Sequence, residues 1–271
     1  MVEHPHVAAG PAADGIDVNV PHSARIWNYW LGGKDNYEVD RVVGEQFRQA
    51  FPAIADNARA FRQFLRRGIH YLTAEAGMRQ FLDVGTGLPT ASNTHDLAQN
   101  VAPESRVVYV DNDPLVLAHA RVLLTSSPEG VTDYLHADLH DTDAILADAA
   151  ATLNFDEPVA LILSGILGHV GDYDEARKIV RRLVDALVPG SHLLVCDGSD
   201  TNAALNQAQQ QHNDRGAVMY HLRSPEEIAG YFSDLVLIEP GVVPCPRWRP
   251  DPAEVGEVSD VDSYGGIGRK S

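Results

Sequence analysis

The stretch QFLDVGTGLPT at residues 80–90 joins a short apolar run to a turn that contains two glycines. The run is typical of a buried strand, and LPTASNTHDLAQNV after the glycines is typical of a helix. Glycines at such a junction let the backbone turn sharply and approach a ligand closely. The dinucleotide-binding pattern G-x-G-x-x-G requires a third glycine where this chain has Thr90. The loop alone therefore fits a ligand site and an ordinary tight turn about equally well.

The alternation of strand and helix continues beyond this stretch. Strand-like runs are RVVYVD (106–111), TDYLHADL (132–139), PVALILS (158–164) and SHLLVCDGS (191–199), and helical patterns follow them at about 114–124, 141–153, 173–188 and 202–213. A capped helix begins at Ser224, a later strand is expected at 234–240, and GEVSDVDSYGGIGRK (256–270) contains the last one. This order predicts an α/β fold with a mostly parallel sheet and helices on both faces.

Three helical segments precede the first strand, at 23–31, from Val39 to Pro52, and at roughly 54–77. The sequence therefore predicts a flexible tail at 1–20, a helical N-terminal extension at 21–78, and an α/β domain at 79–271 that forms one compact unit with the extension.

Of the 271 residues, 44% are apolar and 22% are charged, which is typical of a globular protein. The balance of charges limits the classes of partner that the chain can bind. A net charge of −17 argues against binding to a nucleic-acid backbone, which requires Lys and Arg. We interpret the local cluster Arg62-Arg66-Arg67 as the solvated face of a helix. The 12 histidines and 2 cysteines show no spacing typical of a metal site.

The cysteines, the first residues and the most apolar run indicate the expected cellular location. Two cysteines, Cys196 and Cys245, do not make a disulfide framework, so a reducing cytoplasm is expected. The first residues do not resemble a signal peptide. The most apolar run, at 159–170, is shorter than the ~20 residues that span a bilayer, so we expect a soluble protein with no membrane partner.

Acidic residues stand at the ends of three successive strands. Asp111 ends the second strand, 26 residues after Gly85, where a carboxylate can accept hydrogen bonds from a ribose diol. Asp83 and Asp138 occupy comparable places on the first and third strands. Carboxyl ends of parallel strands line the crevice where open α/β sheets bind ligands. The alternative is that each Asp caps a helix or begins a turn.

Together, FLDVGTG, VVYVDNDP and HADL resemble the class I S-adenosylmethionine-dependent methyltransferases. ARIWNYWLGGKDNYEVDR, DVGTGLPT, VDNDPLVLAHARVLL, RSPEEIAGYF, PRWRPD and YGGIGRK narrow the resemblance to an actinobacterial family called S-adenosyl methyltransferase, over nearly the whole chain from about Pro21. The resemblance implies a Rossmann-like, seven-stranded sheet whose last-placed strand is antiparallel. Pro89 replaces the third glycine of many methyltransferases, which implies a slightly different loop.

The resemblance also implies a role for individual residues around S-adenosylmethionine. Asp83, Gly85 and Gly87, with Thr86 between them, would form the loop under the methionine part. Asp111 would bind the ribose and Asn112 would flank the adenine. Asp138 and Leu139 would meet the edge of the adenine, and Ser164 would lie near the methionine part.

The stretch that opens the extension suggests a lid over the cofactor. At 100° per residue, the apolar side chains of 26–31 share one face of a helix and Arg25 and Tyr29 share the other. We expect Arg25 or Lys34 to meet the methionine carboxylate, Tyr29 to lie near the sulfonium, and Gly33 to allow a close turn. The alternative is a capped helix with a glycine end and exposed polar residues.

Candidates for a general base, needed only if the acceptor is protonated, follow the fourth strand. His169 has a suitable pKa range, and Tyr173 is close to it in sequence. Tyr220 and His221 are weaker candidates, while Asp197 and Ser199 are expected in an acceptor pocket.

The expected function is methyl transfer from S-adenosylmethionine to an unidentified acceptor, a small metabolite or a protein. The alternatives are a non-catalytic regulator that binds this cofactor or S-adenosylhomocysteine, an NAD-dependent oxidoreductase, and an interaction module.

Overall fold

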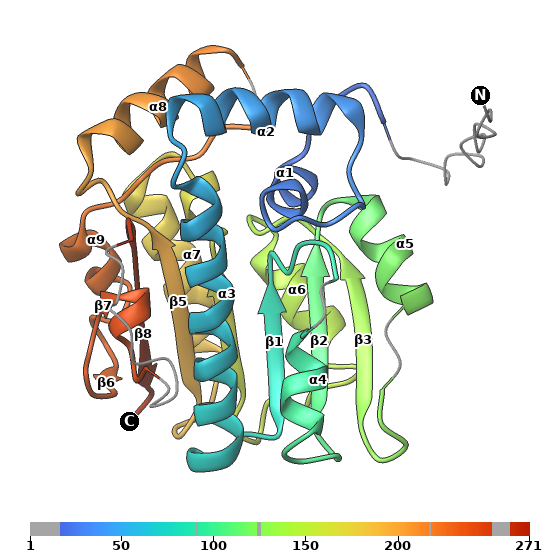
Figure 1. Ribbon diagram of the computed structural model, residues 1–271. Coiled ribbons are helices and arrows are strands. Elements are labelled where there is room, and N and C mark those ends of the chain that lie inside the picture. Colours follow the sequence, from blue (N-terminus) through green and yellow to red (C-terminus); the bar gives the residue numbers. More distant parts are fainter. Residues whose placement is uncertain (1–16, 90–91, 124–125, 217, 251–260) are drawn as a thin grey trace.

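The computed structural model describes residues 17–89, 92–123, 126–216, 218–250 and 261–271 (Figure 1). Most of the predicted tail at 1–20 lies outside these ranges, and so does Thr90. The described helices are α1 (Ser23–Trp30), α2 (Glu38–Ala50), α3 (Ile54–His70), α4 (Thr94–Gln99), α5 (Pro114–Leu123), α6 (Thr142–Ala149), α7 (Tyr173–Asp185), α8 (Ala203–Asp214) and α9 (Pro225–Gly230). The strands are β1 (Gln80–Val84), β2 (Arg106–Asp111), β3 (Val131–His136), β4 (Ala160–Ser164), β5 (His192–Gly198), β6 (Val236–Leu237), β7 (Val243–Pro244) and β8 (Ser263–Arg269).

All of these strands belong to one sheet, with the order β3-β2-β1-β4-β5-β8-β6 and β7 paired to β8. The first five strands run parallel, and β8 is antiparallel to β5, β6 and β7. The predicted mostly parallel sheet with an antiparallel late strand is confirmed. The described residues form eight strands where seven were expected, because the two-residue β7 adds a short pairing to β8.

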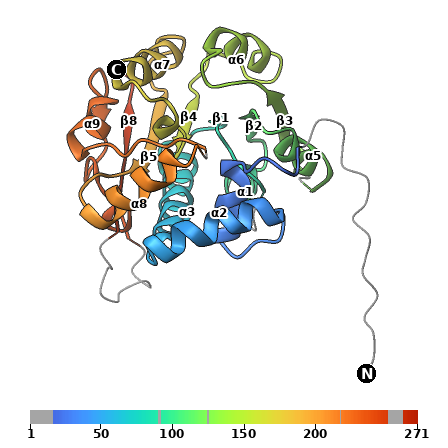
Figure 2. The same cartoon turned by 90° about the horizontal axis from the view of Figure 1, so that it is seen from above.

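The central strands are buried on both faces, which explains their continuous apolar sequences. Figure 2 shows α6 and α7 on one side of the sheet and α3 on the other. Side chains alternate between two core clusters: Leu82, Val84, Val108 and Leu161 pack on the α6–α7 side, and Phe81, Val107, Tyr109 and Ile162 on the α3 side.

Helix α3 lies close against the sheet. A Cβ on Gly68 would lie 2.4 Å from a methyl carbon of Leu194 on β5, so any larger residue here would require the Leu194 side chain to move. The helix ends earlier than predicted, at His70, and the chain continues as one π-helical turn, Tyr71–Glu75.

The prediction that Arg62, Arg66 and Arg67 form a solvated face was wrong for Arg67. This side chain is buried, and its guanidinium donates to the carbonyls of Trp248 at 2.9 Å and Cys245 at 2.7 Å. Arg66 is exposed, as predicted.

The extension covers the carboxyl edge of the sheet. In Figure 1, α2 crosses above the strands and α1 lies beneath it, over the ends of β1 and β2. Arg25 of α1 holds this arrangement together, because its Nε lies 3.7 Å from a carboxylate oxygen of Asp40 on α2 and 3.6 Å from one of Asp113, just after β2. All three side chains are buried.

Candidate functional site

A cavity of ≈380 Å³ opens at the carboxyl ends of β1, β2 and β4, beneath α1. This is the edge at which open α/β sheets bind ligands. The cavity is lined by ten of the residues that the sequence analysis selected: Asp83, Gly85, Thr86, Gly87, Asp111, Asn112, Asp138, Leu139, Ser164 and His169.

The loop after β1 depends on two glycines. Gly85 and Gly87 have φ values of +74° and +67°, a conformation that L side chains rarely adopt. A Cβ on Gly85 would also lie 2.5 Å from the side chain of Ile166. The backbone N–H of Gly87 donates to Oδ2 of Asp111 at 2.9 Å. The loop is therefore fixed against the end of the neighbouring strand.

Asp111 is held with its carboxylate at the cavity. Its Oδ1 accepts the N–H of Asp113 at 2.9 Å, and Oδ2 accepts that of Gly87. Each carboxylate oxygen has a second lone pair, so the group can accept two further hydrogen bonds from a ligand. Burial raises the pKa of Asp111 despite these two bonds.

A carboxylate and a guanidinium lie together at the β1 end of the cavity. Asp83 is buried, and its Oδ2 accepts the hydroxyl of Thr94 at 2.5 Å. Burial raises the pKa of Asp83 to about 6, while that hydrogen bond and the nearby charge of Arg62 act in the opposite direction. Arg62 comes from α3, lines the same cavity and donates to the carbonyl of Ser92 at 2.7 Å. The pair is complementary to a ligand that carries both an ammonium and a carboxylate.

Sequence reasoning missed Arg62 and His22 as cavity residues. The Nδ1 of His22 lies 3.1 Å from Asp113 Oδ2, at the entry to α1. Arg62 follows Phe61, which belongs to the core, by one position on α3. Only the position of α3 against the edge of the sheet brings that guanidinium to Asp83.

Asp138 and Asn112 form the opposite end of the cavity. Oδ2 of Asp138 accepts from the Asn112 amide at 3.1 Å, and Oδ1 accepts from the backbone N–H of His140 at 3.0 Å. Partial burial raises the pKa of Asp138, but the hydrogen bonds from His140 and Asn112 outweigh it and lower this pKa overall. Leu139 adds an apolar surface beside these polar groups.

Four residues predicted to meet the cofactor do not line this cavity: Arg25, Tyr29, Gly33 and Lys34. Arg25 pairs with the two buried carboxylates described above, and Tyr29 donates its hydroxyl to Glu45 at 2.9 Å. Gly33 packs against Asn28, and Lys34 is exposed. The extension reaches the cavity through other side chains of the same segment: His22, Ser23, Ala24, Trp27, Asn28 and Leu31.

The structure separates the two predicted catalytic residues. His169 lies in a 3₁₀ turn (Leu167–His169) after β4 and lines the cavity. Tyr173 begins α7, lines neither this cavity nor the one described next, and donates its hydroxyl to the carbonyl of Glu227 at 2.7 Å.

The contacts of His169 define its tautomer. Its Nδ1 lies 2.8 Å from the carbonyl oxygen of Met219, which can only accept, so Nδ1 carries the proton and Nε2 has a free lone pair. Burial lowers the pKa of His169, so the ring is neutral near pH 7.

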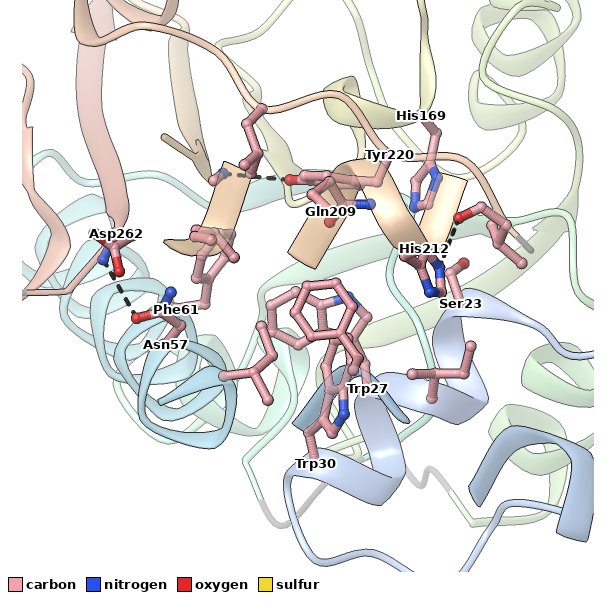
Figure 3. Close-up of a pocket in the computed structure, with 17 residues that line it drawn as sticks. Ser23, Trp27, Trp30, Asn57, Phe61, His169, Gln209, His212, Tyr220 and Asp262 are labelled. Atoms are coloured by element: carbon pink, nitrogen blue, oxygen red, sulfur yellow. Dashed lines mark hydrogen bonds between the residues drawn. The ribbon is translucent and has the colours of Figure 1, made fainter. Parts of the chain in front are cut away.

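A second, smaller cavity of ≈60 Å³ adjoins the first (Figure 3). Both cavities are lined by Ser23, Trp27, Phe61, His169 and Val218. Of the weaker candidates, Tyr220 lines the second cavity, whereas His221 and Ser199 line neither. Asp197 lies behind Tyr220 and accepts a very short hydrogen bond from its hydroxyl. Burial raises the pKa of Asp197 to about 7.

Within the described ranges, no group of three or more His, Cys, Asp or Glu side chains could hold a metal ion. None of the helices in the described part of the chain has both the length and the apolar character needed to cross a membrane.

The chain is similar to known proteins over nearly its whole length. Residues 9–271 match the model of a family described as S-adenosyl methyltransferase. A solved DUF574 family protein from Streptomyces avermitilis is 42% identical, with a TM-score of 0.89, over 94% of this chain and 99% of that one. A putative methyltransferase from Thermobifida fusca is 38% identical, with a TM-score of 0.85, over 95% and 98% of the two chains.

More distant structures share the fold alone. Human N-acetylserotonin methyltransferase, solved in complex with S-adenosylmethionine, is 14% identical with a TM-score of 0.50, over 93% of this chain and 63% of that one. Among the curated proteins, none matches the chain.

Proposed function

Because the chain belongs to the S-adenosyl methyltransferase family and is therefore an S-adenosylmethionine-dependent methyltransferase, we propose that the ≈380 Å³ cavity is its cofactor site. The observation that carries this assignment is the order of polar groups along the cavity. A carboxylate–guanidinium pair stands at one end, Asp111 in the middle, and Asp138 with Asn112 at the other. This order matches the amino-acid, ribose and adenine parts of the cofactor.

The assignments follow from the charges of the groups. Asp83 binds the ammonium of the methionine part, and Arg62 binds its carboxylate. Asp111 accepts hydrogen bonds from the two ribose hydroxyls, and Asn112 and Asp138 meet the polar edge of the adenine. The other residues that the sequence predicts for the cofactor site form the walls of this cavity: Gly85, Thr86, Gly87, Leu139 and Ser164.

Cofactor affinity is expected to depend on pH through Asp83. Below pH 6 this carboxyl is mostly protonated in the free protein, so binding an ammonium first requires the loss of a proton. Affinity should be full above pH 6 and fall as the pH drops below it, by roughly tenfold per unit. Calorimetry with S-adenosylhomocysteine from pH 5 to 8, in buffers of different ionisation enthalpy, should show proton release near pH 6. Asp83→Asn should bind more weakly and without this dependence; a flat profile in the wild type would contradict the assignment.

His169 is proposed as the general base for an acceptor that starts protonated. When bound, S-adenosylmethionine would supply the methyl group to the acceptor oxygen or nitrogen and would leave as S-adenosylhomocysteine, whose sulfur keeps the electron pair of the broken carbon–sulfur bond. The proton of the acceptor passes to Nε2 of His169, which becomes an imidazolium. The carbonyl of Met219 holds the ring in the tautomer that this transfer needs. Tyr173 has no role at the reacting atoms in this account, because its hydroxyl is bound to Glu227.

His169→Gln is expected to lower the rate of methyl transfer by about 10²–10⁴-fold, the usual contribution of a general base. Its affinity for S-adenosylhomocysteine should stay within about twofold, because the ring binds no charged part of the cofactor in this account. The rate would be measured as S-adenosylhomocysteine released from S-adenosylmethionine with a library of small hydroxy and amino compounds. His221→Gln is the matched control, since His221 lines neither cavity and should keep the wild-type rate. Equal rates in both variants would exclude His169 as the base.

A small-molecule acceptor fits the chain better than a nucleic acid. The net charge of −17 disfavours a phosphate backbone as partner. We also place the enzyme in the cytoplasm, on the ground that Cys196 and Cys245 are both free thiols. A non-catalytic regulator would bind the cofactor equally well but would release no S-adenosylhomocysteine with any acceptor.

A further inference from the structure

We infer that the second cavity binds the methyl acceptor, and that this acceptor is an uncharged, ring-bearing small molecule with a hydroxyl or amino group. This inference rests on the proposed function, because it uses the first cavity as the cofactor site. Its support comes from the position of the second cavity, its walls, its charges and its hydrogen-bonding groups.

The second cavity lies where an acceptor must lie. It shares five lining residues with the cofactor cavity, and His169 is among them. A molecule in the second cavity therefore reaches the proposed base and the cofactor cavity at the same junction. In Figure 3, His169 and Tyr220 lie on one side of the pocket and Trp27 and Trp30 on the other.

Aromatic rings form the walls of this cavity. Trp27 makes edge-to-face contacts with Trp30 and Phe61, at centroid distances of 5.7 and 5.2 Å. Trp30 lies 5.2 Å from Phe47. On the other side, His169 and Tyr220 meet edge to face at 5.1 Å. Such walls favour a flat apolar ring, which gains both burial and ring contacts.

Charge argues against an anionic acceptor. None of the described residues that line the cavity is a lysine or an arginine, while Asp262 lines one end. Asp197, with its Oδ1 hydrogen-bonded to the hydroxyl of Tyr220, adds a second acidic group behind the wall. A phosphate or carboxylate on the acceptor would lose its hydration here without meeting a cation, which is costly.

The polar groups of the cavity call for a hydrogen-bond donor on the acceptor. His212 has its Nε2 3.2 Å from the carbonyl oxygen of Val218, so this nitrogen carries the proton and Nδ1 is left with a lone pair. Burial lowers the pKa of His212, as it does for His169. Both rings therefore donate to neighbouring carbonyls and are neutral acceptors at their other nitrogen. A hydroxyl or amine satisfies the Nε2 of His169 and supplies the proton that it removes.

The size of the cavity limits the acceptor further. Its ≈60 Å³ correspond to space for roughly five waters, at ~10–15 Å³ for each. This space excludes a folded protein segment, and a ring system that enters it also occupies the junction that the second cavity shares with the first.

The test compares two probes that share a ring system and differ in charge, 5-hydroxyindole and indole-5-carboxylate. Each is titrated by calorimetry into the full chain saturated with S-adenosylhomocysteine. We expect 5-hydroxyindole to bind about tenfold or more tightly than the carboxylate, because the buried anion finds no partner. Leu222 is half-buried and lines the cavity, so Leu222→Trp should fill part of it. We expect this variant to bind 5-hydroxyindole about tenfold or more weakly, because the larger side chain excludes the ring. Leu237→Trp, on the exposed β6, is the matched control and should bind like the wild type.

The outcomes separate the two proposals. Equal binding of both probes, or 5-hydroxyindole binding that Leu222→Trp leaves unchanged, would overturn the acceptor site. If Leu222→Trp no longer binds S-adenosylhomocysteine, Gln209→Lys serves as the test variant instead. The added cation at this wall should shift the binding preference from 5-hydroxyindole toward indole-5-carboxylate. An unchanged preference would overturn the inference. Failure of the wild type to bind S-adenosylhomocysteine, with 5-hydroxyindole still bound, would refute the proposed cofactor site and leave the ring-binding cavity standing.

Discussion

Arg25→Ala is expected to lower the free energy of unfolding by about 3–5 kcal/mol, the cost of removing one partner from a buried ion cluster. Arg25 is 4% exposed, and the two carboxylates beside it, Asp40 and Asp113, are 0% and 3% exposed. Its guanidinium also donates to the carbonyls of Asp17 at 3.2 Å and Val20 at 2.8 Å. Without it, two buried carboxylates lose the cation that lies between them and the extension loses its link to the sheet. Urea denaturation followed by circular dichroism measures the change.

Arg41→Ala is the matched control for this prediction. Arg41 is on α2 and pairs with Glu38 at 2.8 Å, but both side chains are largely exposed. Exposed pairs of this kind contribute about 1 kcal/mol or less. If Arg25→Ala lowered the free energy of unfolding as little as Arg41→Ala does, the ion cluster of Arg25, Asp40 and Asp113 would not anchor the extension.

Asp111→Ala is expected to weaken binding of S-adenosylhomocysteine by about 100-fold or more. Two hydrogen bonds to a charged acceptor contribute roughly 1.5–3 kcal/mol each, and 1.4 kcal/mol corresponds to a factor of ten. The substitution also removes the group that accepts the N–H of Gly87 at 2.9 Å, so the glycine loop loses a fixed support. Calorimetry on the purified variant gives the dissociation constant.

The matched control for Asp111 is Asp143→Ala, another aspartate-to-alanine change in the same sheet domain. Asp143 is 81% exposed, pairs with Arg182 at 2.6 Å and lines neither cavity. It should bind S-adenosylhomocysteine like the wild type. If Asp111→Ala bound S-adenosylhomocysteine within a few-fold of the wild-type affinity, the ribose would not bind at this end of β2.

The strand ends of the site could be predicted from the sequence because they follow from local patterns. A buried parallel strand places its last residue at the carboxyl edge, so Asp83, Asp111 and Asp138 had to meet there once the strands were recognised. The same reasoning located His169 after β4. The antiparallel β8 was expected near the C-terminus, whereas the two-residue β7 carries no pattern that a sequence could reveal.

The extension could not be predicted side chain by side chain. A helical wheel gives the faces of α1, but the partner of each face depends on how α1, α2 and α3 pack over the sheet. Arg25 was expected at the cofactor and instead pairs with Asp40, 15 residues further along the chain, and with Asp113. Arg25 or Lys34 was expected to meet the methionine carboxylate, a role that we propose for Arg62 because it lines the cavity. The second cavity joins α1, α2 and α3 to α8 and the segment 218–222, a combination that arises only in the folded chain.

We propose that the cavity beneath α1 holds S-adenosylmethionine. Calorimetric titration of the purified wild-type protein with S-adenosylmethionine, S-adenosylhomocysteine and NAD would measure this binding. We predict saturable binding of one molecule of either sulfur compound per chain and no binding of NAD. Binding of NAD without the sulfur compounds, or of none of the three, would contradict the account.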